Sequence, residues 1–391
     1  MITTKRLYQI NSSRILQHIR RNRGKSRISI AEDLELDRST ITKVVRDLME
    51  RGLVRTTGKY RGKPGVGRMA TGLEVDPDFS LVLGIEVQTE FFDAVLVNLD
   101  GHLLDSRRYE YDNKAGELAD RLEAIIADSV KRAIELNASL AGVGIGLSGI
   151  VDPYHGIILN SNPLGISEAY PLRDLLESRL DLPVFVENDA NCCCWGELAF
   201  RRGEDARNFL AVLGEFRNVD VARNRVSGTA FGIGIVIRGS VFHGDTFTAG
   251  EFRSLRYDQK HPSHSQFAIT DSEAARLPKD AAVLGRVFDE VAYNMSLLVN
   301  CLDMTKIVVA GDFAKYAKDL TPRLEREIQR NWLYATPKQC RIEYSPDAAQ
   351  AVPIGAAGLF IEKLFSVPEM TDHTDEDVGF ILLERIAPPA E

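Results

Sequence analysis

Val186-Glu187-Asn188-Asp189-Ala190-Asn191 joins an apolar segment to a run of small residues that continues to Ala199. Asn188 and Asp189 on one turn could bond two adjacent hydroxyl groups, because the amide both donates and accepts and the carboxylate accepts. The carboxylate could also act as a general base toward such a hydroxyl. A second interpretation, compatible with the first, is that the pair caps the helix that follows. The stretch therefore predicts a strand, a turn that binds a ring of hydroxyls, and a helix.

The segments on both sides of this turn have the order of an α/β fold. Upstream, strand-like runs at 81–87, 91–100 and 103–111 precede a helical pattern at 118–136 and a Gly-rich strand at 141–149. Downstream, strand-like runs at 209–212, 232–238 and 240–242 precede a helical pattern at 284–302 and a strand at 306–310. The half-repeated order predicts two lobes, residues 79–190 and 191–365, with a ligand cleft between them. The last helix of the second range is expected to return to the first lobe.

Charge is distributed unevenly along the chain. Residues 1–72 contain 17 Lys and Arg against 6 Asp and Glu, a net charge of +11, whereas the whole chain has a net charge of -8. The remaining residues therefore carry 31 basic and 50 acidic side chains. A basic head on an acidic body is typical of a nucleic-acid-binding module fused to another domain.

The head has the order of a winged helix-turn-helix. Ser29 and Glu32 form a capping-box pattern that predicts a short helix from Ser29, and Asp37 is expected to cap a second helix. The second helix has an apolar face, and its opposite face carries side chains that could reach phosphates and base edges: Arg38, Ser39, Thr40, Thr42, Lys43 and Arg46. The segment 55–68 is predicted to form a basic wing that includes Lys59, Arg61 and Lys63.

These patterns predict a DNA-binding domain at residues 1–70, a linker at 71–78 and an acidic extension at 366–391, in which 378–383 could form a strand. No apolar run reaches the roughly 18 residues that a membrane helix needs, and the N-terminus lacks an apolar signal region. The five cysteines, three of them at 192–194, are interpreted as reduced residues that pack as small hydrophobic groups. We therefore expect a cytoplasmic protein that does not enter a membrane.

Five stretches resemble, in order, the ROK family of repressors and sugar kinases, which has an actin-like fold: 186–191, 228–234, 249–251, 306–311 and 353–358. The head resembles the DNA-binding domain of the repressor branch. The resemblance implies that Asn188 and Glu251 hold a sugar, and that Asp189 stands where the kinases have their general base. Ser148, Gly149 and Asn162 resemble family positions near the sugar, although the same residue types are common in turns.

The chain departs from the kinases of this family at two places. They carry Asp-x-Gly-Gly-Thr after the first strand, where backbone N–H groups wrap the phosphates of ATP, whereas this chain has Glu86-Val87-Gln88-Thr89-Glu90. Their zinc site uses a His three residues after the Glu and a downstream cysteine cluster, but Ser254 stands there and residues 255–275 contain no cysteine. His261 and His264 are interpreted as solvated loop residues. We therefore expect no catalytic residue, no metal and no cofactor.

The sequence thus predicts a regulator that binds operator DNA and a sugar or sugar derivative, and that represses carbohydrate-metabolism genes. We expect a homodimer or a higher homo-oligomer, in which sugar bound between the lobes would change the spacing of two DNA-binding heads. Two alternatives stay open at this point. One is a sugar kinase with an appended DNA-binding head, and the other is a ligand-independent repressor whose body only forms the dimer.

Overall fold

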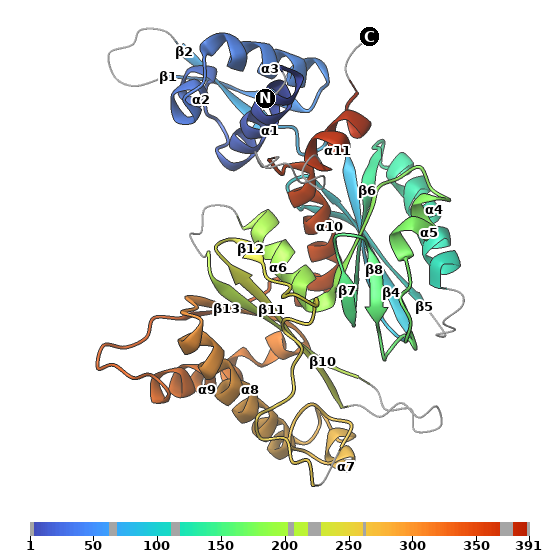
Figure 1. Cartoon of the computed structure of the whole chain (residues 1–391), viewed down its shortest axis with the longest axis vertical. Helices are drawn as coiled ribbons and strands as arrows, with labels where there is room; N and C mark the ends of the chain where they lie inside the picture. Colours follow the sequence, from blue (N-terminus) through green and yellow to red (C-terminus); the bar gives the residue numbers. More distant parts are fainter. Residues whose placement is uncertain are drawn as a thin grey trace.

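The computed structural model describes residues 4–61, 69–110, 118–201, 207–217, 228–260, 263–367 and 378–388. A helical head with a β-hairpin is followed by two α/β lobes, each built on a five-stranded sheet (Figure 1). The helices α6 (Asp189–Phe200) and α10 (Ala351–Leu364) lie between the two sheets. Within the described ranges, no helix combines the length and the apolar character needed to span a bilayer.

The head confirms the predicted winged helix-turn-helix. It contains α1 (Thr4–Arg21), α2 (Arg27–Leu34), α3 (Arg38–Glu50), β1 (Val54–Arg61) and β2 (Met69–Val75). The apolar face of α3 is buried, but α2 begins earlier than predicted, because Ser26 is its N-cap and accepts from the Ser29 amide at 3.3 Å. The capping box predicted at Ser29 is therefore wrong. Asp37 does occupy the N-cap position of α3, although its side chain makes no cap hydrogen bond.

Residues 71–75, expected to be part of a linker, instead form most of β2. Val75 pairs with Val54, and Leu73 pairs with Thr56 and is only 2% exposed. The Gly24 amide donates to the Leu73 carbonyl oxygen at 2.8 Å, which fixes the strand to the helical part of the head. Strand pairing and the burial of Leu73 thus extend the head to Val75, and residues 76–80 connect it to the first lobe.

The first lobe has the strand order β5-β4-β3-β6-β9, in which β3, β6 and β9 are parallel. Helices α4 and α5 pack on one face of this sheet through a shared apolar core. The elements of the lobe are β3 (Leu81–Val87), β4 (Phe91–Asn98), β5 (Leu103–Glu110), α4 (Leu118–Glu135), β6 (Leu140–Leu147), β7 (Ile150–Asp152), β8 (Ile157–Asn160), α5 (Leu172–Glu177) and β9 (Val184–Asn188).

The second lobe has the strand order β12-β11-β10-β13-β14. Helices α8 and α9 cover one face of its sheet, and α6 covers the other. This arrangement confirms the two-lobed α/β architecture. The elements that follow α6 are β10 (Phe209–Phe216), β11 (Thr229–Ile237), β12 (Ser240–Val241), α7 (Asp271–Ala274), α8 (Ala281–Cys301), β13 (Lys306–Gly311), η3 (Asp312–Tyr316), α9 (Ala317–Arg330), β14 (Arg341–Tyr344) and η4 (Ala348–Gln350).

Helices α6 and α10 approach each other backbone to backbone. A β-carbon on Gly355 would lie 1.9 Å from the Cys192 carbonyl oxygen, which is too close for any side chain. On its other side α10 lies directly on the first sheet, since a β-carbon on Gly84 would lie 1.8 Å from the Pro353 carbonyl oxygen. The three consecutive cysteines of α6 are free and buried in this layer. The chain therefore returns to the first lobe through α10.

The segment 378–383, considered above as a strand, is instead part of a helix, α11 (Val378–Ile386). Gly379, Leu382 and Leu383 are buried while Ile381 is exposed, which is the periodicity of a helix packed on one side. This helix contacts α10 and α1, and Figure 1 shows it beneath the head. Packing against two other helices decides its conformation.

Buried charged side chains fix the head to the body. Arg20 of α1 has 4% of its side chain exposed and donates to Glu362 at 2.7 Å and to the Ala199 carbonyl oxygen at 3.0 Å. Arg51, at the end of α3, donates to Glu384 of α11 at 2.8 Å. Apolar side chains of the head, α10 and α11 form one continuous cluster around these contacts. The head is therefore packed directly against the body, in addition to its covalent connection through residues 76–80.

Replacing Arg20 tests this docking. Arg20→Met should lower the free energy of unfolding by about 2 kcal/mol, because Glu362 and the Ala199 carbonyl oxygen lose their buried donor. Equilibrium urea unfolding measures the change. Arg179→Ala is the matched control, since Arg179 pairs with Asp120 on the surface and its loss should leave the urea midpoint in place. Equal midpoints for Arg20→Met and the unmodified chain would contradict a docked head.

Candidate functional site

A cavity of about 430 Å³ opens between the two lobes. This volume lies within the range of small-molecule sites. All six residues expected to contact a sugar line this cavity: Ser148, Gly149, Asn162, Asn188, Asp189 and Glu251. The first five come from the ends of first-lobe strands and the start of α6, and Glu251 comes from a second-lobe loop. The structure thus brings these residues together across the cleft.

Asn188 has the helix-capping role that the sequence allowed. Its side-chain oxygen accepts from the amides of Ala190 at 2.9 Å and Asn191 at 3.2 Å, which caps α6. Its side-chain nitrogen donates to the Gly149 carbonyl oxygen at 3.1 Å. An amide nitrogen carries two N–H groups, and among the described residues the contact with Gly149 uses one of them, so the other can serve a ligand in the cavity that Asn188 lines. Capping and ligand contact are therefore compatible at this residue.

Asp189 begins α6 and is 7% exposed. One carboxylate oxygen accepts from the Ala190 amide at 2.8 Å. Burial raises the pKa of Asp189, while Arg217 and hydrogen bonds from the Ala190 amide and Ser148 oppose that rise. The carboxylate is thus an acceptor held in a low-dielectric wall of the cavity, where hydrogen bonds to a hydroxyl are strengthened.

Glu251 faces Asp189 from the other lobe. It follows Gly250, whose φ of +93° and close approach to the Ile233 carbonyl oxygen both require glycine. Burial, and then the charge of Asp189, raise the pKa of Glu251. Two carboxylates that converge on one cavity suit a ligand that offers several hydroxyl donors.

Ser148, Gly149 and Asn162 are turn residues that also line the cavity. The Ser148 carbonyl oxygen accepts from the Ser161 hydroxyl at 2.6 Å, and the Asn162 carbonyl oxygen accepts from the Gly165 amide at 3.2 Å. Gly149 has a φ of +143°. The structure thus places these three residues both in turns and at the cavity, and their contact with a sugar stays a prediction.

The segment after β3 differs from a phosphate-binding turn. The side-chain amide of Gln88 donates to Glu86 at 2.6 Å and to Glu215 of β10 at 3.0 Å, so it bridges the two lobes. Burial, and then the charge of Glu215, hold the pKa of Glu86 well above its usual range. A side-chain amide and two carboxylates thus meet in the segment where the family resemblance places a glycine-rich, phosphate-binding turn.

Sequence reasoning missed Glu215 and Arg217, which line the same cavity. Arg217 lies 3.5 Å from Glu215 and lowers the pKa of both Asp189 and Glu215 against the effect of burial. Both residues are at the C-terminal end of β10, where no local motif marks them. Their recognition requires knowing that β10 ends at the cleft.

The side chains of Ser254 and His264 make contacts within the protein. Ser254 is buried and accepts from the side-chain amide of Asn294 at 3.3 Å, and His264 pairs with Asp271 at 2.9 Å. In the part of the chain that the structure describes, no three His, Cys, Asp or Glu side chains lie close enough to hold an ion. His261 lies outside the described residues.

The polar face of α3 is accessible, as a DNA-reading helix requires. Arg38, Ser39, Thr42, Lys43 and Arg46 are exposed, and Thr40 is half-buried. The Thr42 hydroxyl donates to the Arg38 carbonyl oxygen at 2.7 Å, and Arg46 lies 3.9 Å from Glu50. Lys59 and Arg61 lie on β1 of the hairpin. Lys63, predicted to be on the wing, lies outside the described residues.

The pH dependence of stability should depend on Glu86. Because the pKa of Glu86 is raised on folding, the native state bears the cost of a buried carboxylate once the pH exceeds the unfolded-state value of about 4.5. Glu86→Gln should therefore raise the melting temperature by a few degrees at pH 7.5, and the gain should vanish near pH 4. Differential scanning calorimetry across this range measures it. A gain that does not change with pH would show that Glu86 is not the group that titrates.

Sequence comparison relates both parts of the chain to known families. Residues 82–263 match the ROK family, and residues 10–55 match a winged helix-turn-helix DNA-binding family. The xylose repressor of Caldicellulosiruptor bescii is 25% identical over 410 residues, covering 93% of this chain and 98% of that protein. A glucokinase of Halalkalibacterium halodurans is 31% identical over 290 residues, covering 57% of this chain and 81% of that protein. For several other xylose repressors, the match spans 59% to 63% of their own length.

A solved structure extends the likeness in fold to nearly the whole chain. The crystal structure of a ROK family transcriptional regulator, described as a homologue of the E. coli MLC protein, superposes with a TM-score of 0.76. The sequence identity is 21%, and the match covers 97% of this chain and 99% of that one. The likeness in fold therefore includes the head and both lobes.

Proposed function

The chain belongs to the ROK family, and from this premise we propose that it is a sugar-responsive DNA-binding repressor of carbohydrate-metabolism genes. The observation that carries the proposal is the pairing of two sites in one chain. Hydroxyl-binding side chains from both lobes line one cavity, and the docked head presents an exposed basic helix. The xylose repressor that matches 93% of the chain supports the same function.

The ligand site is proposed to hold a sugar through Asp189, Glu251 and the remaining N–H of Asn188. Ser148, Gly149 and Asn162 close the cavity on the first-lobe side. Asp189 and Glu251 accept from hydroxyl groups, while Asn188 donates to a sugar oxygen. Arg217 adds a cation that lowers the cost of keeping both carboxylates ionised.

We propose that the chain does not phosphorylate its ligand, although the glucokinase relative is 31% identical. Phosphoryl transfer depends on positioning the phosphates and neutralising their charge. Gln88 bridges Glu86 and Glu215 in the segment where the kinases have their glycine-rich turn, and residues 86–90 contain no glycine that would let backbone N–H groups wrap a phosphate. The carboxylate of Asp189, which stands where the kinases have their base, therefore serves in binding alone.

The proposed mechanism is a shift between two lobe arrangements in the cytoplasm. Sugar that bridges Asp189 and Glu251 favours one angle between the lobes, and the ligand must bind the two arrangements with different affinity. In a homodimer the angle sets the distance between two heads, and operator half-sites about one helical turn apart fit one distance. The docking of α1 on α10 and α11 makes each head follow its body.

A sugar screen tests the ligand site. Full-length protein should show a higher melting temperature with one or a few members of a panel of neutral sugars and sugar phosphates, since a ligand that binds only the folded state stabilises it. ATP with Mg²⁺ should cause no shift. Asp189→Asn should reduce the sugar's shift to near zero, because the amide presents donors where the sugar needs an acceptor. A higher melting temperature with ATP and Mg²⁺ would favour a kinase. An unchanged melting temperature with every compound would favour a body that only forms the dimer.

A salt titration tests the DNA site. Lys43→Ala should weaken binding to a duplex selected from random DNA by the unmodified chain, and should reduce the slope of log affinity against log salt by about 1. Fluorescence anisotropy measures both quantities. Lys279→Ala is the matched control, because Lys279 is exposed and lies between α7 and α8, and Figure 1 shows α7 at the end of the molecule opposite the head. Equal slopes for all three proteins would place Lys43 outside the DNA contact.

A further inference from the structure

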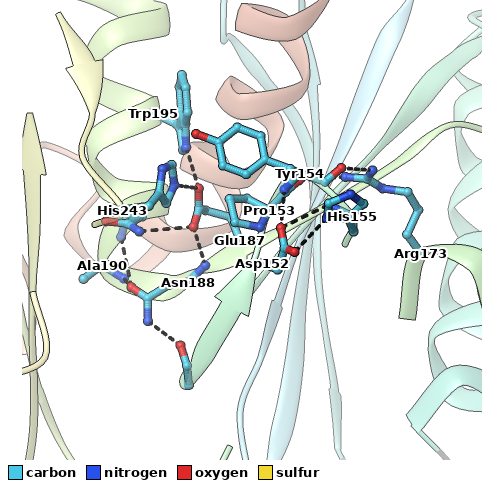
Figure 2. Close-up of polar contacts among 12 residues, drawn as sticks. Asp152, Pro153, Tyr154, His155, Arg173, Glu187, Asn188, Ala190, Trp195 and His243 are labelled. Carbon is cyan, nitrogen blue, oxygen red and sulfur yellow. Dashed lines mark hydrogen bonds and ion pairs between the residues drawn. The ribbon is translucent and has the colours of Figure 1, made fainter. Parts of the chain in front are cut away.

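Glu187 immediately precedes the ligand-site residue Asn188 and is fully buried, with 0% of its surface exposed. Figure 2 shows its carboxylate surrounded by donors. One oxygen accepts from the Asn188 amide at 2.8 Å and from the side chain of Asn191 at 3.1 Å. The other accepts from the indole of Trp195 at 3.0 Å and from His243 at 2.8 Å. A buried carboxylate is tolerated only when such donors replace water.

His243 differs from the other three donors in its origin. Asn188, Asn191 and Trp195 belong to β9 and α6, whereas His243 follows β12 at the edge of the second-lobe sheet. His243 is nearly buried, with 9% of its side chain exposed. The loop that it begins runs to Gly250 and Glu251. The His243–Glu187 hydrogen bond thus ties the loop that carries Glu251 to the strand that presents Asn188.

A second contact holds the same loop. Tyr154, from the turn after β7, packs edge-on against His243, with their ring centroids 5.9 Å apart. The ring centroids of Tyr154 and Phe247 are 6.0 Å apart. The turn is itself fixed, since Asp152 accepts from the Tyr154 amide at 3.0 Å and Arg173 donates to the Tyr154 carbonyl oxygen at 2.7 Å. The first lobe therefore offers a rigid surface against which the loop rests.

We propose that His243 is a positioning residue for the ligand site: its hydrogen bond to buried Glu187 holds the 243–251 loop in place, so that Glu251 faces Asn188 and Asp189 across the cavity. The role in ligand affinity rests on the proposed function, whereas the role in holding the loop does not. Without the bond, Glu187 lacks one donor, and of the two contacts described above between the loop and the first lobe, the packing against Tyr154 is left. The loop would then open more often, which lowers the fraction of molecules with a complete site.

Hydrogen exchange of the ligand-free, full-length protein tests the positioning role. The amides of Ala249 and Glu251 are hydrogen-bonded within the loop, to His243 and Thr248 at 3.2 and 3.1 Å, so their exchange reports its opening. His243→Ala should speed amide exchange over residues 244–251 by about tenfold. The exchange rates of the amides in β3 and β6 should not change. His243→Gln should restore protection, because its amide can donate from nearly the same place. His18→Ala removes a His–carboxylate contact in the head, at 3.1 Å, and should leave the loop unchanged.

Two results would overturn the proposal. One is exchange over 244–251 in His243→Ala that equals that of the unmodified chain. The other is equal acceleration of exchange in His243→Ala and His243→Gln, which would assign the effect to side-chain shape and not to the hydrogen bond.

Calorimetric titration with D-xylose and D-glucose is a second, independent experiment. For a sugar that binds the unmodified chain, the Kd should rise about tenfold in His243→Ala and recover in His243→Gln. Failure of both sugars to bind any variant would count against the proposed ligand class, while the exchange result still decides the role of His243.

Discussion

The backbone contact between α6 and α10 is the constraint on which the rest of the structure depends. Gly355 lets α10 lie against the Cys192 carbonyl oxygen, and Gly84 lets the other side of α10 lie on the first sheet. The two helices therefore form one layer between the lobes. The start of α6 presents Asp189 to the cavity, and near its end the Ala199 carbonyl oxygen accepts from Arg20 of the head. A helix of this length is a rigid connection of about 18 Å.

The cleft combines a cavity with a cluster of buried carboxyl groups beside it. Glu86, Asp189 and Glu215 are carboxylates whose pKa values burial raises, so the native state keeps them at a cost in stability. Gln88 offsets part of that cost by donating to two of them, and in doing so it joins the lobes. The cavity residues thus lie beside an interlobe contact that Gln88 makes in the segment after β3.

The sequence was most informative where local chemistry determines structure. The buried face of α3, the cap at Asn188 and the six cavity residues follow from periodicity, turn chemistry and family motifs. Tertiary packing decided the rest. Pairing with β1 made 71–75 a strand, and packing on α1 and α10 made 378–383 helical. Arg217 was not identified because its place at the cavity depends on where β10 ends, and His243 was not identified because its partner Glu187 belongs to the other lobe.

The proposed function couples ligand occupancy at Asp189 to the placement of the DNA-binding head through the α6–α10 layer. The most direct measurement is the affinity of the full-length protein for its selected operator duplex, with and without a saturating sugar that binds the cavity, at fixed salt. The account predicts a change in Kd of about fivefold or more, the lower end of typical allosteric coupling. Tight sugar binding with an unchanged operator Kd would contradict it.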